Sequence, residues 1–313
     1  MSNLIYHYTS LNALYEIIKT KSLLLPTLHG MNDPLEGGYK PDMFISDLDF
    51  DKYPQNVNEN TKQFFTLLST ILKNNKKQFI KNCKNKTEPY SLSFSMKEDN
   101  ISHWERYGNN MKGVCIAFDL DEMELLNPPL GYEIYLRKII YKEEDRRKYI
   151  RASIVNLYNE INKSIDEKKQ ENFIEIIKKN CVPNLAGIYL SVHYFIKNEY
   201  WNEEDEIRLL YDEQSWKDTL NLLEKIVLNG GKDLIEAYNQ NHLSLGLDKT
   251  EYHCFSTIRP CKRLSLKQAW SEELIPKIII GSKSSQNLKD LKSFLKANDL
   301  GKTKITESRI KIR

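Results

Sequence analysis

Hydrophobic and polar positions along the chain predict short strands that alternate with amphipathic helices. The first element is a strand at residues 4–8. A helix follows it, because apolar residues recur three or four positions apart from Leu11 to Ile18, behind Thr9 or Ser10 as the cap. This opening of strand, cap and helix is typical of a domain that mixes both kinds of element.

The clearest strand signals lie further along the chain. Residues 90–95 (YSLSFS) alternate with period two, so their three serines share one face. Residues 113–119 (GVCIAFD) are apolar enough for a buried strand, and residues 204–211 (EDEIRLLY) alternate charged with apolar positions. Further strands are predicted at residues 132–141, 252–258 and 277–280.

Short strands at irregular spacing, separated by helices, predict an α+β fold with small mixed or antiparallel sheets and helical insertions. We expect a single domain over residues 1–313, because neither an internal repeat nor a low-complexity linker is visible. The predicted core segments are about 1–42, 87–141, 186–212 and 252–282; the predicted insertions are about 43–86, 142–184 and 213–250; a C-terminal helix is expected at about 284–298.

The composition of the chain argues against several classes of partner and of structural site. The 313 residues carry 46 basic and 43 acidic side chains, and a net charge of +3 favours neither bulk DNA nor an anionic membrane. The apolar runs are too short to span a bilayer, and the N-terminus lacks the pattern of a secretory signal. Five scattered cysteines without a C-x-x-C motif disfavour both structural zinc and a disulfide framework. We therefore expect a cytoplasmic protein with no metal site.

The sharpest candidate for chemistry is the charged face of residues 204–211. Glu204 and Glu206 are two positions apart on a strand and repel each other, while Arg208 on the same face neutralises part of that repulsion. Buried charges are costly unless paired, so such clusters often line clefts. A solvated edge strand explains the same pattern more simply. Lys197 and Trp201, just upstream, complete this block.

Two further blocks lie near the N-terminus. His7 ends the first strand beside Tyr8 and Thr9, and these side chains can stack on and hydrogen-bond a planar ligand. A structural histidine is the alternative. Asn32 and Asp33 belong to a predicted turn (NDPLEG). Asn, Asp and Pro each favour turn conformations of the backbone, so a purely structural role is the alternative.

The last block joins the serine strand to the segment WERYG. Ser93 and Ser95 are candidates for a supporting polar row, although such a row is also the ordinary polar face of a strand. Trp104 and Tyr107 lie three positions apart on a short predicted helix, where they could hold a ligand or fill the core. Motifs for a P-loop, a dinucleotide-binding turn and a serine hydrolase are missing from the sequence.

In combination these blocks resemble an uncharacterised bacterial family. The matching segments are YHYTSLNALYEIIKTKSLLL, MNDPLEGG, SFS, WERYGNNMKGVCIAFD, KNEYWNEEDEIRLLY and IIIGSK, and together they cover about half the chain. That family in turn resembles ADP-ribosyltransferase-like proteins of phage-defence or toxin loci. The resemblance implies sheets of the ADP-ribosyltransferase type and NAD as co-substrate.

The same resemblance implies residue roles. Glu206 would be the catalytic carboxylate with Glu204 two residues before it, and His7, the second catalytic residue, would hold a ribose of NAD. Ser93 and Ser95 would lie on the supporting strand. His7 combined with the E-x-E pattern departs from either common triad, and Tyr90, Trp104 and Tyr107 compete for the middle position. The implied cofactor-binding residues are Tyr8, Thr9, Asn32, Asp33, Ser93, Ser95, Trp104, Tyr107, Lys197, Glu204 and Arg208.

The resulting hypothesis is a cytoplasmic NAD-consuming enzyme that transfers ADP-ribose to a protein or nucleic acid, in an abortive-infection or toxin setting and beside a possible defence partner protein. Cleavage of the nicotinamide–ribose bond passes through an oxocarbenium-like state that a carboxylate stabilises. The alternatives are an NAD glycohydrolase, a non-catalytic nucleotide-sensing module, and a metal-dependent nuclease built on His7, Asp33 and Glu36.

Overall fold

The computed structural model describes most of the chain as two compact units. Unit 1 comprises residues 1–30, 87–138 and 203–313, and unit 2 comprises residues 31–86 and 139–202. The prediction of a single domain stays a prediction, and each unit is described on its own. The described residues are 3–28, 39–48, 59–84, 88–126, 134–164, 185–214, 242–255 and 257–311, together with 217, 236, 239 and 240.

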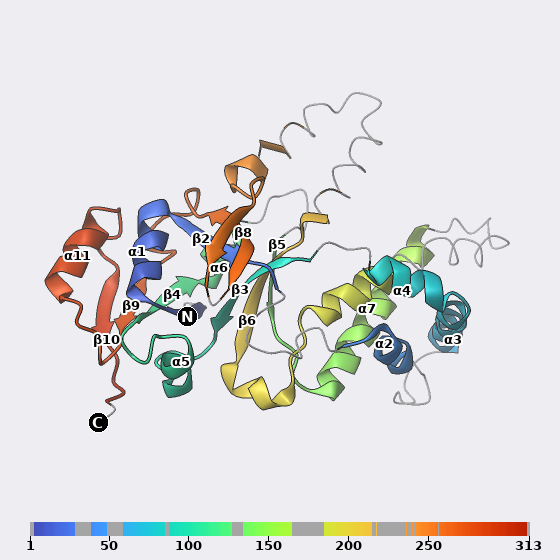
Figure 1. Cartoon of the computed structure of the whole chain (residues 1–313). Helices are drawn as coiled ribbons and strands as arrows, with labels where there is room; N and C mark the ends of the chain where they lie inside the picture. The colour runs from blue at the N-terminus through green and yellow to red at the C-terminus, as the bar shows by residue number, and fades with distance from the viewer. Residues whose placement is uncertain are drawn as a thin grey trace. The chain divides into compact units, whose positions relative to one another are not determined.

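Unit 1 is built around a seven-stranded sheet with the order β10-β9-β4-β1-β3-β6-β5 (Figure 1). Neighbouring strands are antiparallel except β9 and β10, which are parallel. The predicted α+β class with a mostly antiparallel sheet is therefore confirmed. The strands are β1 (Leu4–Thr9), β3 (Tyr90–Ser95), β4 (Val114–Asp119), β5 (Ile134–Lys138), β6 (Glu206–Tyr211), β9 (Lys277–Ile280) and β10 (Lys304–Glu307).

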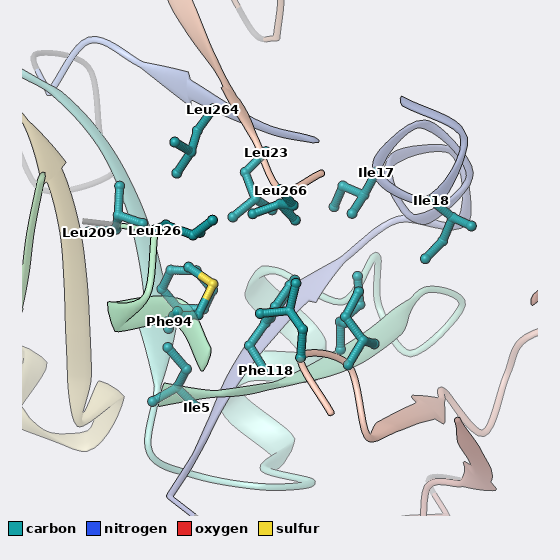
Figure 2. Packing of buried hydrophobic residues seen from close by; sticks show 14 of the residues in the cluster. Ile5, Ile17, Ile18, Leu23, Phe94, Phe118, Leu126, Leu209, Leu264 and Leu266 are labelled. Atoms are coloured by element: carbon teal, nitrogen blue, oxygen red, sulfur yellow. The ribbon is translucent and has the colours of Figure 1, made fainter. Parts of the chain in front are cut away.

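A second, three-stranded sheet contributes to the main core of unit 1. Its order is β2-β8-β7, formed by β2 (Ser22–Pro26), β7 (Glu251–Cys254) and β8 (Ile258–Ser265). Figure 2 shows Leu23 and Leu264 of this sheet on the same cluster as Phe94 and Leu209 of the large sheet. The face of the large sheet that meets this cluster is called the core face.

Short helices complete unit 1. Helix α1 (Leu11–Thr20) begins at Ser10, whose hydroxyl accepts the backbone N–H of Ala13, and its apolar stripe packs on the core as the periodicity predicts (Figure 2). The others are α5 (Ile101–Arg106), α6 (Leu120–Glu124), the 3₁₀ helix η3 (Glu199–Glu204, which begins in unit 2) and α11 (Leu288–Lys296).

The opposite face of the large sheet carries a smaller apolar cluster and the row of serines. Strand alternation places Ile5 and Phe94 on the core face, so Tyr6, Tyr8 and the serines of β3 lie on the other. We call this the serine face. Its apolar part consists of Tyr6, Tyr8, Trp104, Met111, Cys115, Ala117 and Ile279.

Unit 2 is helical in its described parts. A separate apolar cluster holds it together, and the buried carboxylate of Asp47 receives Arg146 and the Tyr39 hydroxyl at 2.9 and 2.7 Å. Its helices are α2 (Pro41–Asp47), α3 (Glu59–Asn74), α4 (Lys76–Lys84), α7 (Glu143–Ser164) and a helix over residues 185–193. In the described ranges of both units, we find no helix with the length and apolar character that a bilayer span requires.

Several predicted boundaries need correction. The strand predicted at residues 252–258 is instead the hairpin of β7 and β8, whose turn lies within the predicted range. The C-terminal helix begins at Leu288 rather than Ser284, because Asn287 caps it by accepting the N–H groups of Lys289 and Asp290. The predicted insertion at 213–250 lies largely outside the described residues.

Gly113 provides a test of the packing between β1 and β4. A Cβ at this position would lie 2.1 Å from the carbonyl oxygen of Thr9, which is backbone and cannot easily move. We expect Gly113→Ala to lower the free energy of unfolding by about 1–3 kcal/mol through overpacking. The matched control is the helical Gly187→Ala, where the space is open and a gain of about 0.5–1 kcal/mol is expected. Urea denaturation measures both, and equal effects would contradict this account.

His242 makes the stability of unit 1 depend on pH. Burial, then the nearby Lys262, lower the pKa of His242 from 6.5 to about 4, and its Nε2 lies 2.8 Å from the Tyr211 hydroxyl. Between these pH values the unfolded chain binds a proton at His242 that the folded protein does not. The contribution of the neutral, buried His242 to the free energy of unfolding is therefore complete above pH 6.5 and is lost as pH falls towards 4. We expect a slope of up to about 1.4 kcal/mol per pH unit in that window.

Urea midpoints at pH 7, 5.5 and 4.5 measure this slope. His242→Gln keeps an acceptor for Tyr211 but cannot be protonated, so its stability should vary less across the window. The same slope in His242→Gln as in wild type would rule out this assignment.

Candidate functional site

A buried ion pair lies on the serine face at the start of β6. Ile207 and Leu209 belong to the core face, so Glu206 and Arg208 alternate to the opposite side. The Arg208 Nε donates to Glu206 Oε1 at 2.9 Å and its Nη2 donates to Oε2 at 3.2 Å. Only 2% of the Glu206 side chain and 1% of the Arg208 side chain are exposed, so this bidentate pair is desolvated.

The serines of β3 hold this segment from the neighbouring strand. Ser93 lies opposite Arg208 in the antiparallel register, and its hydroxyl donates to Glu206 Oε1 at 2.6 Å. Ser95 lies opposite Glu206 and donates to the backbone carbonyl of Glu204 at 2.7 Å. The third hydroxyl, Ser91 Oγ, is buried and has no hydrogen-bond partner among the described residues.

Glu204 is held by the segment that begins with α5. The Tyr107 hydroxyl donates to Glu204 Oε1, and an Arg106 nitrogen lies 3.6 Å from the same oxygen. Asp205, between the two glutamates, adopts a left-handed φ of 43° that non-glycine residues rarely occupy. The two carboxylates are thus fixed by different partners on either side of a strained residue.

His103 connects the same helix to the backbone of Glu204. Its Nε2 lies 3.1 Å from the Glu204 carbonyl oxygen, and its Nδ1 lies 2.9 Å from Asn100 Oδ1. Burial lowers the pKa of His103, while the carbonyl and the charge of Glu204 oppose that shift.

Tyr8 and Trp104 hold the segment around Asn100, the residue that His103 contacts. The Tyr8 hydroxyl accepts the Asn100 N–H at 2.9 Å and donates to the carbonyl of Lys97 at 2.8 Å. Trp104 is fully buried, packs edge-on against Tyr8 at 5.1 Å, and donates its indole N–H to Asp99 at 2.8 Å. Two of the three predicted ligand-binding aromatics, Tyr8 and Trp104, therefore fill the cluster of the serine face in this structure.

His7 lies on the other face of the sheet. It follows the alternation of Ile5, and its ring packs 5.7 Å from Phe94 on the core face. Its Nδ1 contacts the Ser93 carbonyl at 3.1 Å, and burial lowers its pKa. Ser93 thus contacts both predicted catalytic residues, but the imidazole and the Glu206 carboxylate do not share a face.

The remaining predicted residues are dispersed. Thr9 ends β1 opposite Val114. Lys197 belongs to unit 2, where its Nζ lies 5.2 Å from the ring centre of Trp201. Asn32 and Asp33 lie outside the described residues, as do two of the three side chains of the nuclease alternative.

The structure therefore brings together Ser93, Ser95, Tyr107, Glu204, Glu206 and Arg208, and it adds two residues that the sequence analysis passed over. Asn100 accepts the N–H groups of Ser102 and His103, so it is the cap of α5. An asparagine directly before the ISHWER segment is a readable capping signal. The role of His103 has no comparable signal, since its partner is a backbone carbonyl distant in sequence.

Part of the chain is similar to a known protein family. Residues 103–209 match a family model described as a protein of unknown function (DUF2971), which covers about a third of the chain. No curated protein and no solved structure shows significant similarity. The matched segment begins at His103 and includes Glu204, Glu206 and Arg208.

The buried pair predicts an asymmetric response to mutation. Arg208→Met leaves the Glu206 carboxylate buried without its bidentate donor, so we expect a loss of about 3–5 kcal/mol in the free energy of unfolding. The double variant Glu206→Gln/Arg208→Met removes both charges and should be more stable than Arg208→Met alone. Urea denaturation of the four proteins in this cycle measures the coupling. Additive effects of the two single substitutions would contradict a direct pair.

Proposed function

We propose that the chain is an NAD-consuming, ADP-ribosyltransferase-like enzyme whose site lies on the serine face around Glu206. The observation that carries this proposal is the fixed carboxylate: Ser93 and Arg208, on two adjacent strands, donate three hydrogen bonds to it. A carboxylate that is already oriented stabilises developing positive charge without reorganisation. Cleavage of the nicotinamide–ribose bond develops such charge on the ribose, as glycoside cleavage does.

The polar groups of the serine face suit a ligand rich in hydroxyl and phosphate oxygens. Ser91 Oγ is a buried hydroxyl that lacks a partner in the part of the chain that the structure describes, and such groups are rare unless something else satisfies them. It lies on the strand and face that present Ser93 to Glu206. The Ser91 hydroxyl can donate to or accept from a ribose hydroxyl, and it can donate to a phosphate oxygen.

Each residue of the cluster has a distinct role in this proposal. Glu206 stabilises the ribose cation, while Ser93 and Arg208 hold its carboxylate in place. Glu204, held by Tyr107, supplies a second carboxylate two positions away. His7 has no part in it, because its ring lies on the core face.

The acceptor of the ADP-ribose group is a protein or a nucleic acid in this proposal, and water would make the enzyme an NAD glycohydrolase. The resemblance noted in the sequence supports sheets of the ADP-ribosyltransferase type and a place in bacterial phage defence. One observation favours a second function, a non-catalytic nucleotide-sensing module: Glu206 is 2% exposed and fully engaged with Arg208.

Incubation of the purified protein with NAD labelled in the adenylate part separates these functions. Label on a macromolecule indicates transfer, free nicotinamide with free ADP-ribose indicates hydrolysis, and retention without turnover indicates sensing. Neither binding nor turnover of NAD would overturn the proposal.

The critical substitution is Glu206→Gln. We expect it to lower NAD turnover by about a hundredfold or more, because a single preorganised electrostatic group contributes about 3 kcal/mol to the barrier. Circular dichroism and the melting temperature show whether the variant is folded. Ser93→Ala, which removes one hydrogen bond to the carboxylate, gives a milder test of the same role. The control is Glu307→Gln on β10, an exposed glutamate whose loss should leave turnover unchanged.

A further inference from the structure

The imidazole of His103 lies between two oxygens that can only accept hydrogen bonds. The first is the carbonyl oxygen of Glu204, at 3.1 Å from Nε2. The second is Asn100 Oδ1, at 2.9 Å from Nδ1. The identity of this atom as oxygen is fixed, because it also accepts the backbone N–H groups of Ser102 and His103 at 3.0 and 3.3 Å.

This geometry has a consequence for the proton count. A neutral imidazole carries one N–H and can donate to only one of the two oxygens, whereas the imidazolium donates to both. The complete bridge from the cap of α5 to the Glu204 backbone therefore requires the protonated ring. The unprotonated ring leaves one nitrogen lone pair facing an oxygen.

We propose that His103 is a positioning residue for the two carboxylates at Glu204 and Glu206, and that its protonated form completes the bridge that holds them. The part of this inference that concerns turnover rests on the proposed function. The bridge itself does not depend on that function. Both ends of the longer hydrogen bond, His103 and Glu204, lie in the segment matched by the family model.

The carbonyl of Glu204, which His103 contacts, directly precedes a strained residue of the backbone. It also accepts the Ser95 hydroxyl, and the following residue, Asp205, has the left-handed φ of 43°. Strained residues persist when the surrounding structure over-determines them. Loss of one donor at this carbonyl therefore acts directly on the peptide that links Glu204 to Glu206.

The surroundings set the direction of the pH dependence. Burial is the largest influence on the pKa of His103, and it lowers that pKa. The charges of Lys97 and Arg106 also lower it, whereas the charge of Glu204 raises it. The bridge is thus complete on the acidic side of a pKa below 6.5 and loses one hydrogen bond as pH rises through it. The titratable and charged groups around the ring are Tyr8 of β1, Lys97 after β3, Arg106 and Tyr107 at the end of α5, and Glu204.

The first arm of the test is NMR titration of the whole chain, which needs no substrate. We expect the ring nitrogens of His103 to show two N–H groups at low pH, and the amides of Asp205 and Glu206 to shift with the same midpoint. His103→Gln should abolish that midpoint, while His253→Gln should leave it unchanged. Glu204–Glu206 amides that do not respond to the His103 titration would overturn the inference.

The second arm is the pH profile of NAD turnover. We expect kcat to fall roughly tenfold as His103 loses its proton, with KM little changed, because the bridge from Asn100 to the Glu204 carbonyl then loses one of its two hydrogen bonds. His103→Gln keeps an N–H donor and should show a flat profile over that range; His103→Leu should stay low at every pH. A His103→Gln profile identical to wild type would overturn the role in catalysis. If wild type shows no turnover, the proposed function fails and the NMR arm alone decides the bridge.

Discussion

The structure of the serine face depends on one requirement, which is that the desolvated charges of Glu206 and Arg208 remain paired. An isolated buried carboxylate or guanidinium costs several kcal/mol, so the two side chains must lie on one face and at bidentate distance. Antiparallel register then determines what surrounds them. Serines, which are small and can donate, occupy the facing positions of β3 and bring a hydroxyl to Glu206 and another to the adjacent backbone.

The same requirement explains why the polar cluster is so closely connected. Once Glu206 is fixed by β6 and β3, the bend at Asp205 carries the chain to Glu204, which Tyr107 and His103 contact from α5. That short helix is itself placed by the Asn100 cap and by the indole of Trp104 bonded to Asp99. A preorganised carboxylate pair is thus obtained from strand alternation, one cap and a few long-range hydrogen bonds.

Sequence patterns predicted those parts of the site that depend on local periodicity. The alternation within residues 204–211 predicts Glu206 and Arg208 on one side of a strand, and the serine strand is equally readable. The prediction of a strand at Glu204 is wrong, because that residue ends the 3₁₀ helix η3 and β6 begins at Glu206. The relation between strands is not local, so the separation of His7 from Glu206 could not be read from the chain. Whether the odd or even residues of β1 share a face with the serines depends on its pairing of Tyr6 with Ser95.

The strands β7 and β8 show a different limit. The run from Ile258 to Ser265 contains Pro260 and three basic residues, which obscure the apolar alternation of a central strand. Its burial comes from β2 and the core cluster, which are distant in sequence. Tertiary context therefore overrides a weak local signal there.

The strand order of the large sheet has a consequence for how the chain folds during synthesis. Strand β3 ends at Ser95, yet its neighbour β6 begins only at Glu206. At about 5–20 residues per second, the ribosome takes on the order of ten seconds to make the intervening chain. During that interval one edge of β3 waits for its partner. The Ser93 hydroxyl that will later bind Glu206 can be satisfied by water, whereas apolar side chains in place of the three serines would favour aggregation of the nascent chain.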